Sequence, residues 1–205
     1  MRTGPDVVSF KFARRREDNN QNQKDHHYFL NYKGGQYAIV DLETKEDPEG
    51  PLRSFTMASS PTEEDFILIS TRIRDTPFKK KLASLDVGTS VNMTAPLGKF
   101  VLHEDYSKIV VFLSGGIGVT PFRSMIKYAT DTQLPMKITI FDSNRNQDNI
   151  LFKDEIDEWA SLNRNLKIIY TLDVSDNDWN GERGYINQVM VIKFLGKTEL
   201  DNSIF

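Results

Sequence analysis

The sequence predicts a chain in two halves, an antiparallel β half followed by a parallel α/β half. Up to about residue 102, short β-like runs are separated by turn residues, a spacing typical of an antiparallel barrel or sandwich. Beyond residue 102, strands alternate with helices, which predicts a parallel sheet with right-handed crossovers. The length of 205 residues fits one large domain or two small ones, and the change of pattern favours two, at residues 1–102 and 103–205.

In the first half, apolar patterns predict four strands. Residues 7–12 and 66–74 alternate apolar and polar side chains, as half-buried strands do. Residues 36–42 are mostly apolar, and residues 91–95 follow a glycine turn. The polar stretch 14–27 predicts a surface loop, and we expect its three arginines at 14–16 to form a solvated edge rather than a binding site.

In the second half, three apolar runs predict parallel strands, each followed by a helical segment. The strands are expected at residues 109–113, 137–141 and 166–172, and the helices at residues 121–128, 150–162 and 187–194. The run 109–113 is apolar without a break, which indicates a strand covered on both faces.

The composition excludes several classes of function. A net charge of −3, from 26 basic and 29 acidic residues, supplies no strong basic field for nucleic-acid binding. Without cysteine there is no thiolate zinc site and no cysteine-ligated iron-sulfur cluster, and we predict no metal site. The longest apolar run is far shorter than the roughly 18 to 20 residues of a membrane helix. We therefore expect a soluble, cytoplasmic protein with no membrane span, whose redox chemistry would need an organic cofactor.

A glycine-rich turn joins the first strand of the second half to its helix. Gly115, Gly116 and Gly118 let a ligand approach the backbone closely, and free amides at the helix start attract an anion such as a pyrophosphate. Pro121 suits the first helical turn, where proline loses no hydrogen bond. The pattern differs from the usual G-x-G-x-x-G, and a tight connection without a ligand explains it equally well.

In the first half, the segment Arg53-Ser54-Phe55-Thr56 follows a turn-rich stretch and reads as extended. Arg53 could clamp a phosphate, Phe55 could offer a ring for stacking, and Thr56 could add a hydrogen bond. The alternative is an ordinary strand with Phe55 in the core.

A short helix is predicted shortly after the strand at 66–74. Thr76 is its expected N-cap and Pro77 its first residue. Free amides at this helix start, with Lys79 nearby, would suit a phosphate. The alternative is that the lysines only form a solvated helix face.

Several motifs, taken together and in this order, resemble the ferredoxin:NADP reductase superfamily. They are GQY at residues 35–37, RSFT at 53–56, APLGKF at 95–100, GGIGVTP at 115–121 and SNR at 143–145. The resemblance covers nearly the whole chain. It implies an N-terminal antiparallel Greek-key β-barrel that binds FAD, followed by a parallel α/β domain that binds NAD(P).

The resemblance also implies roles for individual residues. Arg53 would neutralise the FAD pyrophosphate, Phe55 would pack against the isoalloxazine, and Thr56 would place its hydroxyl near the flavin N5. Thr120 would sit where the nicotinamide and the flavin meet, so Thr56 and Thr120 are the predicted catalytic residues. The predicted cofactor-binding residues are Arg53, Ser54, Phe55, Thr56, Thr71, Thr76, Pro77, Phe78, Lys79, Gly115, Gly116, Gly118, Thr120, Pro121, Ser143 and Arg145.

At its C-terminal end the sequence departs from the family pattern. The family continues with a strand that ends in a Gly-Pro-Pro type motif, then a helix and a last aromatic segment. This sequence stops at residues 202–205, which resemble the opening of that strand. We therefore expect the second domain to lack its last strand and helix, and the nicotinamide side to be less complete than the FAD side. A naturally short protein, a shortened chain and a tail missing from this sequence all stay open.

The implied reaction is hydride transfer from NADH or NADPH to FAD, followed by electron release to an acceptor such as a heme, iron-sulfur or flavin protein. Ser143 and Arg145 could bind a 2′-phosphate, which favours NADPH slightly, although Arg145 could instead cap the acidic helix at 150–162. The competing hypothesis is a non-catalytic flavin- or nucleotide-binding module. The sequence does not indicate an oligomeric state.

Overall fold

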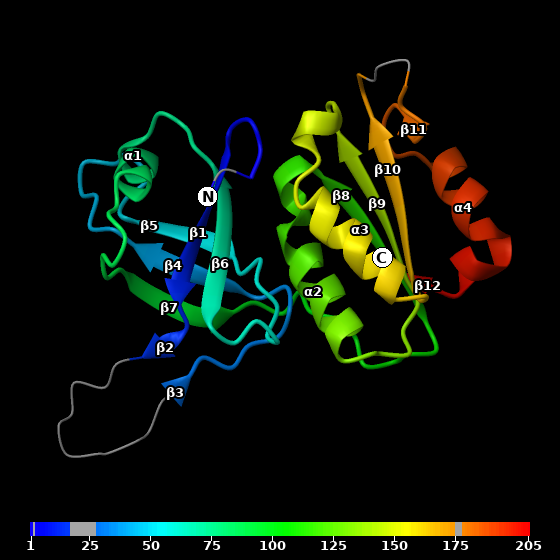
Figure 1. Ribbon diagram of the computed structural model, residues 1–205, viewed down its shortest axis with the longest axis horizontal. Helices are drawn as coiled ribbons and strands as arrows, with labels where there is room; N and C mark the ends of the chain where they lie inside the picture. Colours follow the sequence, from blue (N-terminus) through cyan, green and yellow to red (C-terminus); the bar gives the residue numbers. More distant parts are fainter. Residues whose placement is uncertain (2, 17–27, 175–177) are drawn as a thin grey trace.

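The computed structural model describes residues 1, 3–16, 28–174 and 178–205, which form two lobes side by side (Figure 1). The β lobe contains β1 to β7 and the helix α1 (Pro77–Ala83), and the α/β lobe contains β8 to β12 and the helices α2 to α4. The boundary predicted at residue 102 falls in the connection between β7 (Asn92–Leu97) and β8 (Ile109–Gly115).

The β lobe is built from antiparallel sheets around one core. β1 (Val7–Ala13) pairs with β6 (Phe66–Arg72), and β4 (Tyr37–Asp41) lies between β5 (Leu52–Thr56) and β7. The short strands β2 (Arg15–Arg16) and β3 (Tyr28–Phe29) form a third antiparallel pair. Alternate side chains of the longer strands point inward with Phe78 and Leu82 of α1. The predicted strands are confirmed within a few residues, whereas most of the predicted loop, at 17–27, lies outside the described residues.

The arginines at 14–16, which follow β1 in the sequence, do not form a fully solvated edge. Arg14 is buried, its Nε donates to the Leu30 carbonyl at 3.0 Å, and its Nη1 donates to the Pro61 carbonyl at 2.6 Å. Its guanidinium also lies 5.0 Å from the centre of the Tyr32 ring. The prediction is wrong for Arg14, because loop carbonyls distant in sequence satisfy its donors.

The α/β lobe is a parallel sheet covered on both faces. The strand order is β11 (Glu182–Arg183), β10 (Leu166–Leu172), β9 (Ile138–Asn144), β8 and β12 (Ser203–Ile204). The helices α2 (Thr120–Asp131) and α3 (Lys153–Leu162) cover one face, and α4 (Gln188–Asp201) covers the other (Figure 1). Residues 203–204 form the two-residue strand β12, which pairs with β8 in parallel.

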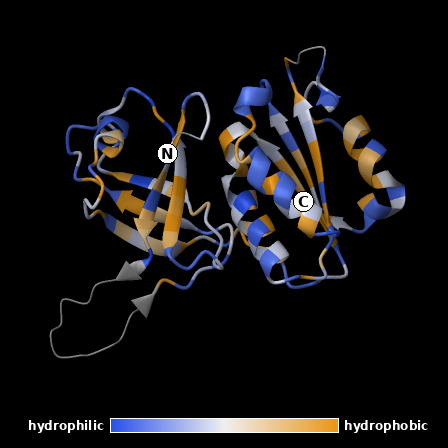
Figure 2. Ribbon diagram, viewed as in Figure 1, coloured by the Kyte–Doolittle hydropathy of each residue, from blue (hydrophilic) through white to orange (hydrophobic). Residues whose placement is uncertain are grey.

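The alternation of side chains along β8 explains the two layers. Val110 and Phe112 join the core under α2 and α3, whereas Ile109 and Val111 join the core under α4. Because both faces are buried, the strand reads as one apolar run, and Figure 2 shows apolar residues on the strands and on the helix sides that face them. Among the described residues, no helix is both long and apolar enough to cross a membrane.

Two elements of this lobe differ from the prediction. α4 runs to Asp201 because a second helical segment follows Gly196, whose φ of 69° joins the two parts. β11 is only two residues long, and its residues show no strand periodicity in the sequence.

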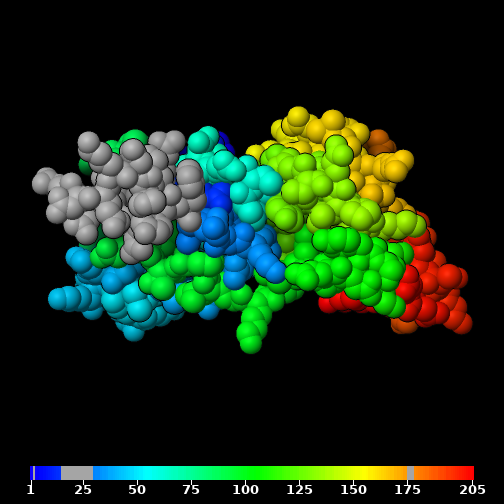
Figure 3. Space-filling model, turned by 90° about the horizontal axis from the view of Figure 1, so that it is seen from below, coloured from blue at the N-terminus to red at the C-terminus, as the bar shows by residue number. Residues whose placement is uncertain are grey.

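The helix α2 packs against loops of the β lobe. The Ser124 hydroxyl donates to the Ser59 carbonyl at 2.5 Å, and the Thr62 hydroxyl donates to Asp131 at 2.5 Å. Gly34 lies so close that an added Cβ would come within 3.1 Å of the Met125 backbone. In Figure 3, blue and cyan β-lobe segments touch the green surface of α2 and its surroundings. The two lobes therefore share a packed, polar interface.

Candidate functional site

Two neighbouring pockets lie where the lobes meet. The larger one, of about 600 Å³, is called the sheet pocket and is lined by Pro5, Asp6, Arg72, Gly115, Gly116, Ser143, Asn144, Arg145, Asn149, Asp173 and Tyr185. The smaller one, of about 270 Å³, is called the barrel pocket and is lined by Glu49, Arg53, Thr71, Arg72, Arg74, Thr76, Lys79 and Ile117. Arg72 lines both pockets, so the two are adjacent.

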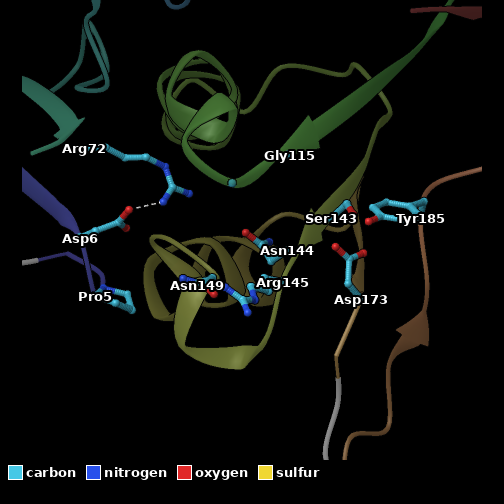
Figure 4. Close-up of a pocket in the computed structure, with 11 residues that line it drawn as sticks. Pro5, Asp6, Arg72, Gly115, Ser143, Asn144, Arg145, Asn149, Asp173 and Tyr185 are labelled. Atoms are coloured by element: carbon cyan, nitrogen blue, oxygen red, sulfur yellow. Dashed lines mark hydrogen bonds and ion pairs between the residues drawn. The ribbon is translucent and has the colours of Figure 1, made fainter. Parts of the chain in front are cut away.

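The sheet pocket opens at the carboxyl ends of the parallel strands. Gly115 ends β8, Ser143 lies near the end of β9, and Asp173 directly follows β10. Figure 4 shows these ends converging on one space, with Tyr185 on its far wall. Ligands of open α/β sheets bind at this edge, because loops leave a crevice there.

The predicted glycine turn forms one wall of the sheet pocket. Gly115 is extended, and Gly116 has a φ of 52° at the start of the 3₁₀ turn η1 (Gly116–Val119). The positive φ favours glycine at position 116, and an added Cβ would lie 3.1 Å from Nη2 of Arg72, which would have to shift slightly. Pro121 lies in the first turn of α2, as predicted.

Buried polar groups lie at the base of the sheet pocket. The amide nitrogen of Asn144 donates to Asp142 at 2.8 Å, whereas the amide oxygen of Asn144 has no hydrogen-bond partner among the described residues. Burial raises the pKa of Asp142 despite the hydrogen bond from Asn144. The Asn144 side chain is therefore held at the pocket edge by Asp142, with its amide oxygen buried.

The barrel pocket is rich in positive charge. Three arginines and a lysine line it, against one carboxylate, Glu49, among the described lining residues. The ammonium of Lys79 donates to the Thr71 hydroxyl at 2.5 Å and lies 4.4 Å from the centre of the Phe55 ring. Burial and the nearby charges of Arg53 and Arg74 lower the pKa of Lys79 to about 8. Such crowding of like charges favours an anionic ligand.

Arg53 is held at the edge of this pocket by the preceding turn. Its Nη2 is 2.6 Å from Oδ1 of the buried Asp47 and also pairs with Glu49 at 3.1 Å. Its Nη1 donates to the carbonyls of Gly50 at 2.7 Å and Leu52 at 2.8 Å. The guanidinium is therefore positioned before any ligand arrives.

The start of α1 differs from our prediction. Thr76 is the N-cap and Pro77 follows, as predicted, but the Phe78 amide donates to Asp47 at 2.9 Å and the Lys79 amide donates to Thr76 at 3.2 Å. The prediction that these first amides are free for a phosphate is therefore wrong. Proline has no amide hydrogen, and protein groups already satisfy the next two residues.

The other predicted residues lie outside the pocket linings. Phe55 is buried in the β-lobe core, 6.0 Å from the ring of Phe78, which favours the alternative reading of this strand as core. The Thr120 hydroxyl donates to the Ile117 carbonyl at 3.2 Å. Ser54, Thr56, Pro77, Phe78, Gly118, Thr120 and Pro121 do not line either pocket. Roles of Thr56 and Thr120 in catalysis stay predictions.

Several pocket residues were missed by the sequence reasoning. Arg72 ends β6 and Arg74 follows two positions later, and this pair of basic residues at a strand end is a signal that could have identified both. Asp47 does not line a pocket but holds Arg53, and its sequence context indicates only a turn residue. Asp6, Asn149 and Tyr185 carry no local pattern, because distant parts of the chain bring them to the pocket.

Comparison with known proteins places these features in context. A family model described as "Oxidoreductase NAD-binding domain" matches residues 112–204. The reductase subunit of glycine betaine monooxygenase from Chromohalobacter salexigens is 30% identical over 85% of this chain and 48% of its own length. The reductase subunit of stachydrine N-demethylase from Rhizobium meliloti is 26% identical over 98% of this chain and 54% of its own. The chain thus spans about half the length of these relatives.

Solved structures share the fold. The cytochrome b5 reductase domain of Ulva prolifera nitrate reductase superposes with a TM-score of 0.75 at 21% identity, over 96% of this chain and 80% of that one. The Amycolatopsis cytochrome P450 reductase superposes with a TM-score of 0.73 at 16% identity, over 95% of this chain and 55% of that one. The predicted arrangement of an antiparallel β half and a parallel α/β half is therefore confirmed.

Proposed function

The chain belongs to the ferredoxin:NADP reductase superfamily, and from this premise we propose that it is an FAD-dependent oxidoreductase that takes a hydride from NAD(P)H and passes electrons to an external acceptor. The observation that carries the proposal is the pair of adjacent pockets, one rich in cations and one at the glycine turn. Two anionic nucleotides bound in these pockets would meet near Arg72.

The donor set of the barrel pocket fits the diphosphate of FAD. Arg53 offers a guanidinium that Asp47 holds in place, and Lys79 offers an ammonium whose pKa is lowered by burial and, further, by the charges of Arg53 and Arg74. A diphosphate would relieve this repulsion. Because the first amides of α1 are occupied, we assign the binding to these side chains rather than to the helix start.

The sheet pocket fits a nicotinamide dinucleotide. Gly115 and Gly116 leave backbone exposed at the strand end, where the anionic part of a dinucleotide would lie. Ser143 and Arg145 lie in the same pocket and carry a hydroxyl and a guanidinium. A 2′-phosphate would suit this pair, so we favour NADPH over NADH.

In the proposed mechanism the protein aligns two rings and excludes water. The chemistry that FAD supplies when bound is the uptake of an electron pair and its release one electron at a time. The packed interface of α2 with the β lobe fixes the distance between the pockets. Thr56 at the end of β5 and Thr120 at the start of α2 stay the proposed catalytic residues, although neither lines a pocket.

The electron acceptor is proposed only by class. Two relatives are named as the reductase parts of a monooxygenase and a demethylase, and a third, from Moritella marina, as one component of a Na⁺-translocating NADH-quinone reductase. We propose a heme, iron-sulfur or flavin protein as the partner, because this chain has no cysteine to build a cluster of its own. A cytoplasmic location stays a prediction.

The test is an anaerobic titration of the purified protein loaded with FAD. We expect a bound-flavin visible spectrum that bleaches rapidly on addition of NADPH, and more slowly or at higher concentration with NADH. A yellow protein that neither nucleotide bleaches would favour the alternative of a flavin-binding module without catalysis. A protein that binds no flavin would reject both.

A further inference from the structure

Arg72 is the one side chain among the described residues that lines both pockets. It ends β6 in the β lobe, yet its Nη2 lies against Gly116 of the α/β lobe, 3.1 Å from where a Cβ would be. Figure 4 shows its guanidinium between Asp6 and the glycine turn. A β-lobe cation therefore reaches the nucleotide turn of the other lobe.

The present partner of Arg72 is a carboxylate that a ligand could replace. Its Nη1 forms an ion pair with Asp6, and the two side chains are 32% and 47% exposed. An ion pair this exposed to water contributes little stability. A diphosphate carries more negative charge and matches the forked guanidinium better, so it would compete well for Arg72.

We propose that Arg72 exchanges Asp6 for the diphosphate of a nicotinamide dinucleotide in the sheet pocket. The inference rests on the proposed function and adds a residue from the other lobe to the site. The position of Arg72 at the glycine turn, away from Arg145 after β9, assigns it to the diphosphate and leaves a 2′-phosphate to Arg145 (Figure 4). Asp6 is then a competitor that holds the arginine until the ligand binds.

The test is calorimetric titration of the FAD-loaded protein with two probes. ADP-ribose carries the diphosphate, whereas adenosine 2′-monophosphate carries a single phosphate at the other end. We expect Arg72→Gln to weaken ADP-ribose binding about tenfold, the scale of one charge-assisted hydrogen bond, and to leave binding of the monophosphate within about twofold. Arg145→Gln should show the reverse preference.

The Asp6→Asn variant provides the matched control for the exchange. It should tighten ADP-ribose binding about threefold, the scale of an exposed ion pair, and it should have no effect in the Arg72→Gln background. Equal affinity of wild type and Arg72→Gln for ADP-ribose would overturn the proposal, as would equal losses for both probes. Loss of FAD from Arg72→Gln with unchanged ADP-ribose binding would also overturn it. A wild-type protein that binds neither probe would reject the proposed nucleotide site itself.

Discussion

Arg123 and the cations that line the barrel pocket differ in the charge of their surroundings. Arg123 of α2 is 2% exposed, and its five hydrogen bonds go to Glu63, Glu155 and the Ala58 carbonyl, at 2.8 to 3.2 Å. The barrel pocket instead gathers three arginines and Lys79 on an open wall with Glu49 as the one lining carboxylate among the described residues. Carboxylates therefore outnumber the cation around Arg123, whereas cations outnumber carboxylates along the lining of the barrel pocket.

The pKa values reflect the same difference. Burial alone would lower the pKa of Arg123, but the carboxylates hydrogen-bonded to it hold that pKa above its ordinary value. For Lys79, burial and neighbouring cations act together and lower the pKa to about 8. Arg123, paired with carboxylates from both lobes, therefore holds the lobes together. The crowded cations of the barrel pocket would instead be stabilised by an anionic ligand.

The largest effect is expected at Arg123. Replacement by methionine removes a guanidinium that links the β lobe to α2 and α3 and leaves two carboxylates without it. We expect the free energy of unfolding, measured with urea, to fall by about 3 kcal/mol. Lys33→Met is the control, because its ion pair with Glu104 is highly exposed and its loss should cost less than about 1 kcal/mol. Equal losses in the two variants would contradict the stabilising role assigned to Arg123.

Arg53 should matter most for flavin affinity. Arg53→Ala should weaken FAD binding by about 1.5 to 3 kcal/mol, because a charge-assisted contact with the diphosphate is lost. Fluorescence quenching of added FAD measures this. Since Arg53 also pairs with the buried Asp47, the Arg53→Ala variant should lose stability as well. The double variant Arg53→Ala, Asp47→Asn should recover part of that stability without recovering FAD affinity. Lys80→Ala, at an exposed lysine that pairs with Asp75, is the control. An unchanged FAD affinity would reject the role of Arg53.

Lys79 should make flavin binding depend on pH. With a pKa of about 8, its ammonium is mostly charged at pH 7 and mostly neutral at pH 9, so FAD affinity should fall by up to about tenfold over this range. The free protein should instead gain stability as the pH rises above 8, because the unfolded chain still binds the proton there. Lys79→Arg keeps its charge, and its FAD affinity should not change with pH. Parallel curves for wild type and Lys79→Arg would exclude Lys79.

The smallest effect is expected at the glycine turn beside Arg72. Gly116→Ala forces a side chain onto a residue with a φ of 52° and against Nη2 of Arg72, and should destabilise the protein by about 1 kcal/mol. Gly118→Ala is the matched control, because nothing lies within 4 Å of its added Cβ. Thermal unfolding compares the two. A similar melting temperature for both variants would show that Arg72 does not need this close approach.

Local patterns predicted much of this fold. The apolar runs placed the strands of both lobes, and Thr76 and Pro77 predicted the start of α1. Local patterns could not show that Asp47 would occupy the α1 amides, because that contact joins residues 31 positions apart. Likewise, the two carboxylates around Arg123 come from different lobes, so no spacing in the sequence brings them together. The boundary between residues 102 and 103 as a limit of folding units stays a prediction.

Several short motifs singled out in the sequence contribute a residue to one of the two pockets. The glycine turn with Ser143 and Arg145 indeed lines one pocket, and Arg53 with Lys79 lines the other. Phe55 shows the limit, since its alternation on β5 is the same for a core ring and for a stacking ring. Only tertiary packing decides between them.

The central claim is that the cations of the barrel pocket bind the diphosphate of FAD. Comparing the affinities of the protein for FAD and for riboflavin tests it most directly, because the two share the flavin ring and differ by the diphosphate and adenosine. The account predicts that flavin-free protein binds FAD much more tightly than riboflavin, and that removing the charges of Arg53 and Lys79 together abolishes most of this preference while the chain stays folded. Equal affinity of the wild-type protein for FAD and riboflavin would contradict the assignment of the barrel-pocket cations to a diphosphate.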